Sequence, residues 1–205
     1  MSKYAAQARD WTESAYGDAS SYLGHRAELA VSLGPRLGPG DTVLDLACGD
    51  GGLAEFLPRG IHYRGADATP EMVEAARRRG HDVVLGDLND YDPPQPVAAT
   101  LCFRAIYYAR DRRAFFERAR LYTTKKLVFD LNPRQYRLEE VRRELREAGF
   151  ERLALRPFLV PQRAALPAQL RRAAIAFERS GPPARLLLRL RFTYLCAAFS
   201  EGTKR

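Results

Sequence analysis

VLDLACGDGGLAEF, residues 43–56, joins an apolar strand to a helix through a glycine-rich turn. Such a turn usually binds a phosphate, because its exposed N–H groups and the positive end of the helix dipole favour negative charge. This turn instead carries carboxylates at Asp45 and Asp50, which would oppose a diphosphate. The stretch therefore predicts an α/β fold whose ligand is something other than a diphosphate.

Apolar runs alternate with amphipathic stretches from residue 42 onward, which is typical of repeated βαβ units. We expect a three-layer, doubly wound α/β fold with a mostly parallel, seven-stranded sheet. An N-terminal helical cap precedes the sheet, and a helical insertion precedes its last strand. The predicted strands are 42–47, 61–67, 82–86, 97–103, 125–131, 150–160 and 189–199, and the stretch ARLLLRLR (184–191) that leads into the last one could instead begin as a helix.

Helix signals lie between these strands. Thr69 and Pro70 are good residues to begin a helix that Gly80 ends, and Asp111 is a good N-cap for another. The predicted helices are 70–79, 111–121, 135–149, 167–180 and a short one between the glycine turn and Pro58.

The length of 205 residues predicts a single domain, because two ordinary domains would need a longer chain. We divide residues 1–205 into an N-terminal cap (1–40), a ligand-binding core (41–158) and an insertion with the final strand (159–199). The three cysteines are widely separated, without metal-ligand spacing, so neither a disulfide framework nor a metal site is expected. The absence of a signal-like or membrane-spanning apolar stretch predicts a cytoplasmic protein.

Charge is unevenly distributed along the chain. The formal net charge is −6 over residues 1–100 and +14 over residues 101–205. A basic half suits RNA, anionic lipid or an acidic substrate, but basic runs without a motif are usually solvated faces. We therefore favour a solvated basic face over a nucleic-acid surface.

The glycine turn also matches a dinucleotide fingerprint, G-x-G-x-x-A, through Gly49, Gly51 and Ala54, with Asp67 at the end of the second strand. The acids beside the glycines oppose a pyrophosphate. A nucleoside that carries cationic groups and no phosphate fits better, and S-adenosylmethionine has a sulfonium, an ammonium and a ribose diol that an aspartate would bind.

Several ordered motifs resemble the class I S-adenosylmethionine-dependent methyltransferases over roughly residues 40–155. VLDLACGDG is similar to the first motif, with Ala47 where many members have glycine. GADATPEMVEAAR resembles the second, GDLND the third and LCFRAIYY the fourth. The resemblance implies a Rossmann-like fold and a cofactor site formed by Arg26, Asp45, Ala47, Cys48, Gly49, Asp50, Gly51, Asp67, Ala68, Met72, Asp87, Leu88, Phe103 and Arg104.

Within that site the resemblance places Asp67 at the ribose hydroxyls, Met72 against the adenosine and Asp87 at the adenine. Arg26 matches an upstream arginine that some members use for the methionine carboxylate, and Tyr22 shares its helical face. The acids also have structural explanations, because aspartates cap helices and shape turns.

No catalytic residue is assigned. His25, Tyr107 and Tyr108 are candidates for a general base, and each also has a structural explanation as a surface, capping or packing residue. The expected acceptor is a small, hydrophobic molecule whose pocket is built by the N-terminal helices and the insertion. An RNA- or protein-directed methyltransferase that uses the basic half is the alternative, and peripheral contact with lipid and the oligomeric state stay open.

Overall fold

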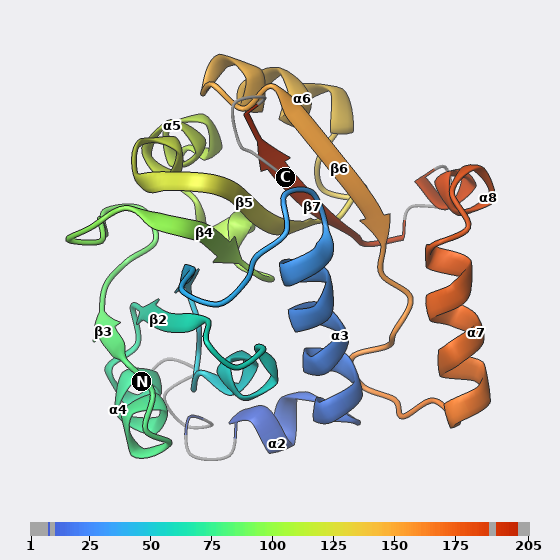
Figure 1. Ribbon diagram of the computed structural model, residues 1–205, viewed down its shortest axis with the longest axis horizontal. Coiled ribbons are helices and arrows are strands. Elements are labelled where there is room, and N and C mark those ends of the chain that lie inside the picture. Colours follow the sequence, from blue (N-terminus) through green and yellow to red (C-terminus); the bar gives the residue numbers. More distant parts are fainter. Residues whose placement is uncertain (1–7, 9–10, 189–191, 201–205) are drawn as a thin grey trace.

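The computed structural model describes residue 8, residues 11–188 and residues 192–200. Its centre is a seven-stranded sheet in the order β3-β2-β1-β4-β5-β7-β6 (Figure 1). β7 runs antiparallel to both β5 and β6, and the other pairs are parallel, so the predicted sheet is confirmed. The strands are β1 (Thr42–Leu46), β2 (His62–Asp67), β3 (Val83–Leu85), β4 (Val97–Cys102), β5 (Thr123–Leu131), β6 (Arg152–Pro157) and β7 (Tyr194–Phe199).

Helices cover both faces of the sheet. The described helices are α2 (Trp11–Ala15), α3 (Ala19–Ser32), α4 (Pro70–Arg78), α5 (Arg112–Tyr122), α6 (Leu138–Glu147), α7 (Ala168–Glu178) and α8 (Pro182–Arg185), with 3₁₀ turns η2 (Gly52–Phe56), η3 (Ile106–Tyr108) and η4 (Leu186–Leu188). One core cluster joins α5 and α6 to the sheet, and a second joins α3 and η2 to the other face. Successive strand residues alternate between these clusters, which is why the strands are apolar throughout.

Two helix predictions need correction. The segment after the glycine turn forms the 3₁₀ helix η2 and not an α-helix. Pro58 lies two residues beyond the end of η2 and disfavours the helical conformation at the residue before it, so the segment is not extended into a longer helix. Thr69 is the N-cap residue of α4, but its side chain makes no capping hydrogen bond. Asp111 caps α5 as predicted, accepting a hydrogen bond from the Ala114 N–H at 3.1 Å.

A buried lysine of β5 hydrogen-bonds the C-terminal end of α3 and so holds that helix against the sheet. Lys126 of β5 is fully buried, and its Nζ donates to the carbonyls of Val31 and Leu33 at 3.0 and 2.7 Å. These carbonyls lie at the C-terminal end of α3, where a helix has unsatisfied acceptors. The contact fixes the end of α3 that is remote from the carboxyl edge of the sheet.

Candidate active site

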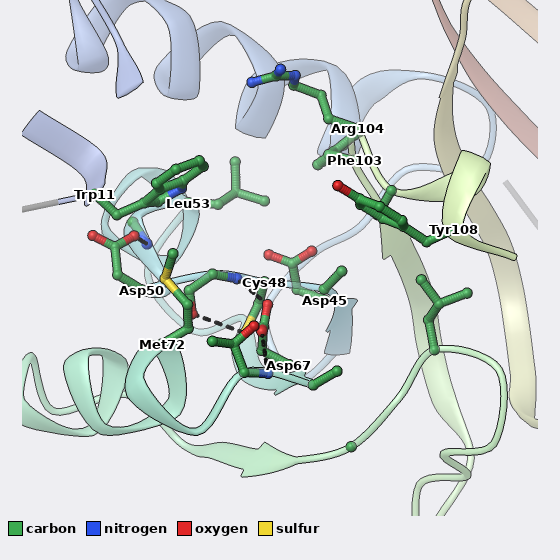
Figure 2. Close-up of a pocket in the computed structure, with 18 of the residues that line it drawn as sticks. Trp11, Asp45, Cys48, Asp50, Leu53, Asp67, Met72, Phe103, Arg104 and Tyr108 are labelled. Atoms are coloured by element: carbon green, nitrogen blue, oxygen red, sulfur yellow. Dashed lines mark hydrogen bonds between the residues drawn. The ribbon is translucent and has the colours of Figure 1, made fainter. Parts of the chain in front are cut away.

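A cavity of about 440 Å³ lies at the carboxyl ends of β1, β2 and β4. β1 and β4 are neighbours at the point where the strand order reverses, which is where open α/β sheets bind their ligands. Figure 2 shows Asp45 near the centre of this cavity, with Trp11 and Met72 on one side and Tyr108 on the other. The sequence-predicted site residues that line it are Arg26, Asp45, Ala47, Cys48, Gly49, Asp50, Asp67, Ala68, Met72, Asp87, Leu88, Phe103 and Arg104.

The glycine turn has three residues in the left-handed region. Ala47, Gly49 and Gly51 have φ angles of 56°, 60° and 75°. Gly51, although predicted, does not line the cavity; it lies against His81, whose ring would be 2.7 Å from a Cβ added there. Gly51 is therefore required by the shape of the turn, while Gly49 faces the cavity beside Trp11.

Asp45 is a buried acid with an unusual titration. Its Oδ2 accepts a hydrogen bond from the Tyr63 hydroxyl at 3.2 Å. Burial raises the pKa of Asp45 to about 7; the Tyr63 bond opposes this and Asp67 adds to it. Such a carboxyl is half protonated at neutral pH and gains charge when a cation approaches. Asp45 is thus suited to a positively charged ligand group.

Asp67 and Asp87 shape the backbone as well as facing the cavity. Asp67 accepts from the N–H groups of Gly49 and Thr69 at 2.8 and 2.9 Å. Asp87 accepts from the Asn89 N–H at 2.8 Å and bonds its side-chain amide at 2.7 Å. Each carboxylate oxygen has two lone pairs, so these turn contacts leave acceptor capacity for a ligand.

Asp50 has a different role from the one its position suggests. It accepts from the N–H and hydroxyl of Thr12 at 3.0 and 2.7 Å and pairs with Arg79 at 3.2 Å. Its charge is compensated by Arg79 and it ties α2 to the turn. The repulsion of a diphosphate therefore rests chiefly on Asp45 and Asp67 rather than on Asp50.

Arg26 is a buried cation at the edge of the cavity. Its Nη2 donates to the Tyr22 hydroxyl at 2.8 Å and to Asp130 at 2.9 Å. Burial, the largest single cause, lowers the pKa of Arg26, but the charge and hydrogen bond of Asp130 together with Tyr22 and Tyr16 raise it above its usual value, so the guanidinium stays charged. Its Nε and Nη1 are buried and have no hydrogen-bond partner among the described residues. Unsatisfied buried donors are costly, so these atoms indicate a place for a ligand acceptor.

The sequence-based interpretation did not include several cavity residues. Trp11, Thr12, Tyr16, Leu23 and Leu53 line it from the N-terminal helices and η2. Trp11, Tyr16 and Leu23 belong to the apolar N-terminal helical region that the sequence predicts at the edge or mouth of the sheet, although they were not assigned to the cofactor site. Further lining residues outside the predicted set are Gly52, Thr69, Gly86, Asn89, Ala105 and Arg110.

Of the three general-base candidates, the two tyrosines line the cavity and the histidine does not. His25 does not line the cavity; its ring bonds Glu178 at 2.5 Å and Glu28 at 3.1 Å, so it is a structural residue. Tyr107 and Tyr108 do line the cavity. Tyr16 lies there too, and burial raises its pKa to about 12, so it is a hydrogen-bond donor rather than a base near neutral pH.

The helical insertion does not build the pocket that the sequence led us to expect. No described residue of the range 159–188 lines the cavity. Instead α7 packs on the outer side of α3, where Arg171 pairs with Asp18 at 3.4 Å and Arg179 with Glu28 at 2.9 Å (Figure 1). The apolar side chains of Leu170 and Phe177 are exposed there.

Two absences concern the described part of the chain only. None of its helices has the length and apolar character needed to cross a membrane. Within residues 8, 11–188 and 192–200 there is no cluster of His, Cys, Asp and Glu that could hold a metal ion.

Comparison with known proteins agrees with this geometry. Residues 43–126 match the family model described as methyltransferase domain. Trans-aconitate 2-methyltransferase from Mycobacterium tuberculosis is 34% identical over 93 residues, which make up 43% of this chain and 36% of that relative. The chain thus aligns with about a third of the length of the curated relatives it matches.

Solved structures extend the similarity to the whole fold. A chain from the complex between the Haloferax volcanii Trm112 methyltransferase activator and a methyltransferase superposes with a TM-score of 0.68, 19% identity and 98% coverage of both chains. Magnesium protoporphyrin IX methyltransferase from Synechocystis PCC 6803, solved with bound S-adenosylmethionine, gives 0.61, 14% and coverage of 98% and 99%. Residues 43–126 therefore resemble a methyltransferase domain in sequence, and the fold as a whole matches that of methyltransferases, one of which was solved with S-adenosylmethionine bound.

Proposed function

We propose that the chain transfers the methyl group of S-adenosylmethionine to a small, partly apolar acceptor. The observation that carries the proposal is the charge pattern of the cavity, whose lining combines Asp45 and Asp67 at the glycine turn with the unsatisfied guanidinium edge of Arg26. The cofactor has cationic groups and a carboxylate in one molecule. A pyrophosphate would satisfy Arg26 but would meet the two acids.

The residues fit the parts of the cofactor as follows. Asp45 faces its cationic end, Arg26 binds its carboxylate, and Asp67 accepts from the ribose hydroxyls. Met72 and Leu88, both buried at the cavity wall, pack against the adenosine. When bound, S-adenosylmethionine supplies an electrophilic methyl group on a sulfonium.

The chain contributes alignment and shielding from water. Holding two reactants in a productive orientation contributes about 7–11 kcal/mol in favourable cases. Phe103, Tyr107 and Tyr108 follow β4 and line the side of the cavity where an acceptor would lie. Their rings suit a flat or apolar molecule, and the exposed Arg104 beside them suits an acidic group on it.

The basic half of the chain gives little support to an RNA-directed enzyme. Arg112 makes two hydrogen bonds to Glu144 at 2.6 and 2.7 Å, and Arg118 makes two to Asp92 at 2.7 and 3.0 Å. Arginines that are paired with acids present less free positive charge to phosphates. This pattern supports a solvated, internally paired surface.

The acceptor class is tested with labelled cofactor. Purified protein is incubated with methyl-labelled S-adenosylmethionine and either a small-molecule cell extract or total RNA and protein, and trans-aconitate is included because a relative carries that name. We expect label in the small-molecule fraction. A variant with Asp67→Ala is the control, because it removes the acceptor for the ribose and for the Gly49 N–H. Enzyme-dependent label confined to RNA or protein would replace this proposal with its alternative.

A further inference from the structure

Asp130 is a buried acid behind the cavity with no part in the cofactor contacts proposed above. It lies near the end of β5 and does not line the cavity. One carboxylate oxygen accepts from Arg26 Nη2 at 2.9 Å, and the other accepts from the backbone N–H of Arg104. A single side chain thus connects α3 with the turn after β4.

The hydrogen bond to Asp130, together with the surrounding rings, fixes the orientation of the Arg26 guanidinium. Tyr22 and Asp130 use both protons of Nη2. The rings of Tyr22, Phe103 and Phe158 lie 4.8, 4.9 and 4.9 Å from the guanidinium carbon and cover its faces. The Nε and Nη1 edges are therefore left for a ligand in a fixed direction.

The same acid holds an unusual backbone conformation. Arg104 has a φ of 53°, in the left-handed region that a residue with a side chain seldom adopts. Such a conformation is unfavourable and persists where other contacts enforce it, most often at functional sites. The hydrogen bond from its N–H to Asp130 is such a contact, and Figure 2 shows the Arg104 side chain reaching over the cavity toward α3.

We propose that Asp130 is a positioning residue that orients Arg26 toward the carboxylate of the cofactor and holds the Arg104 turn at the mouth of the cavity. The inference rests on the proposed function, because it takes Arg26 as the carboxylate ligand. It adds that the affinity for the amino-acid part of the cofactor depends on an acid that never touches it.

Two ligands that differ only in that part provide the test. S-adenosylhomocysteine has the ammonium and carboxylate, whereas 5′-methylthioadenosine keeps the adenosine and thioether without them. Calorimetry on Asp130→Asn should show S-adenosylhomocysteine binding about tenfold more weakly, the scale of one charge-assisted hydrogen bond, and 5′-methylthioadenosine binding unchanged. Equal losses for the two ligands, or none, would overturn the proposal.

Further variants separate positioning from general damage. Arg26→Gln should weaken S-adenosylhomocysteine at least as much, and adding Asp130→Asn to it should cause no further loss, because Asp130 acts through Arg26. Asp92→Asn, the same exchange at an acid paired with Arg118, is the matched control and should change neither affinity. If Asp130→Asn fails to fold, Asp130→Glu replaces it, because this variant keeps the charge but moves the carboxylate that Arg26 Nη2 bonds. A selective loss for S-adenosylhomocysteine then supports the proposal, and an equal loss for both ligands, or none, contradicts it.

The two proposals fail in distinguishable ways. If the unmodified protein binds neither adenosine ligand, the proposed function is wrong. If it binds both and Asp130→Asn does not discriminate between them, only the role of Asp130 is wrong.

Discussion

At the scale of single residues, the chemistry of the site depends on where charge is buried. Asp45 and Arg26 are both buried at the cavity, one with a carboxyl that titrates near neutral pH and the other with unsatisfied donors. A buried carboxyl without a cation and buried donors without an acceptor are both energetically unfavourable in the free protein. Both would be relieved by a ligand with a cation and a carboxylate.

Asp45 makes the affinity for the cofactor depend on pH. Because its pKa is raised to about 7 in the free protein and a cation favours the carboxylate, binding should release a proton. The affinity for S-adenosylhomocysteine is expected to fall about tenfold between about pH 7.5 and about pH 6. Calorimetry in buffers of different ionisation enthalpy measures both the affinity and the proton release.

The matched variant is Asp45→Asn, which keeps the shape but cannot titrate. Its affinity should be weaker at pH 7.5 and nearly constant over this range. An unmodified protein whose affinity is the same at both pH values would show that Asp45 is not a ligand for the cation.

The sequence predicted those site residues that can be recognised from their spacing within a short segment. Asp45, Gly49 and Asp67 stand at strand ends with familiar spacing, and all three line the cavity. Asp50 was predicted as a site residue and lines the cavity, but its bond to Thr12 across 38 residues was not predictable, nor was the bond of Asp130 to Arg26 across 104, because these partners are distant in the sequence. The assignment of these residues to cofactor binding stays a prediction.

At the scale of elements, α3 is held from three sides. Lys126 binds its C-terminal carbonyls, Asp130 binds Arg26 on its inner face, and Glu178 of α7 binds His25 on its outer face. Glu178 is buried and also accepts from the Leu159 N–H at 2.6 Å. The insertion therefore supports α3 from its outer side, and its described residues do not line the cavity.

Removing Glu178 should loosen α7 and leave the cavity intact. Glu178→Ala strands the His25 ring and the Leu159 N–H, and a buried unsatisfied group costs about 1–3 kcal/mol. We expect a lower free energy of unfolding by that amount, faster hydrogen exchange in α7, and an affinity for S-adenosylhomocysteine within about twofold of the unmodified protein.

Arg179→Ala is the comparison variant, because it removes an exposed pair between the same two helices. Exposed pairs contribute about 0–1 kcal/mol, so its effect should be small. A large loss of affinity in Glu178→Ala with α7 still protected from exchange would mean that the insertion does contribute to the site.

The helices were predicted correctly where a capping residue and the spacing of apolar residues indicated the same boundary. Asp111 begins α5 and Gly80 follows α4, as the sequence indicated. The prediction failed for η2, a five-residue segment that begins after the left-handed Gly51 and ends two residues before Pro58, because the sequence pattern of so short a segment does not distinguish a 3₁₀ turn from an α-helix. The position of α7 was not predictable, because its contact with α3 depends on pairs such as Glu178 and His25 that are 153 residues apart.

At the scale of the whole molecule, the order of the strands determines where the ligand lies. Reversal between β1 and β4 opens a crevice at their carboxyl ends, and the cavity occupies it. The alternation of apolar runs predicted this sheet, including its seven strands. It did not predict the direction of β7, which the sequence leaves undetermined because an apolar strand reads alike in both orientations.

The charge asymmetry of the chain is resolved only in three dimensions. The sequence showed a basic C-terminal half, and in the fold several of its arginines pair with acids from both halves, such as Arg118 with Asp92 and Arg112 with Glu144. Net charge along the sequence therefore says little about free charge on a surface. The preference for a small acceptor over RNA stays a proposal.

The central claim is that the acids of the glycine turn select a cation-bearing nucleoside. Calorimetry of the purified, folded protein with S-adenosylhomocysteine and, separately, with NADH tests it most directly. We expect saturable binding of S-adenosylhomocysteine and no binding of NADH. Binding of NADH by a folded protein that ignores S-adenosylhomocysteine would contradict it.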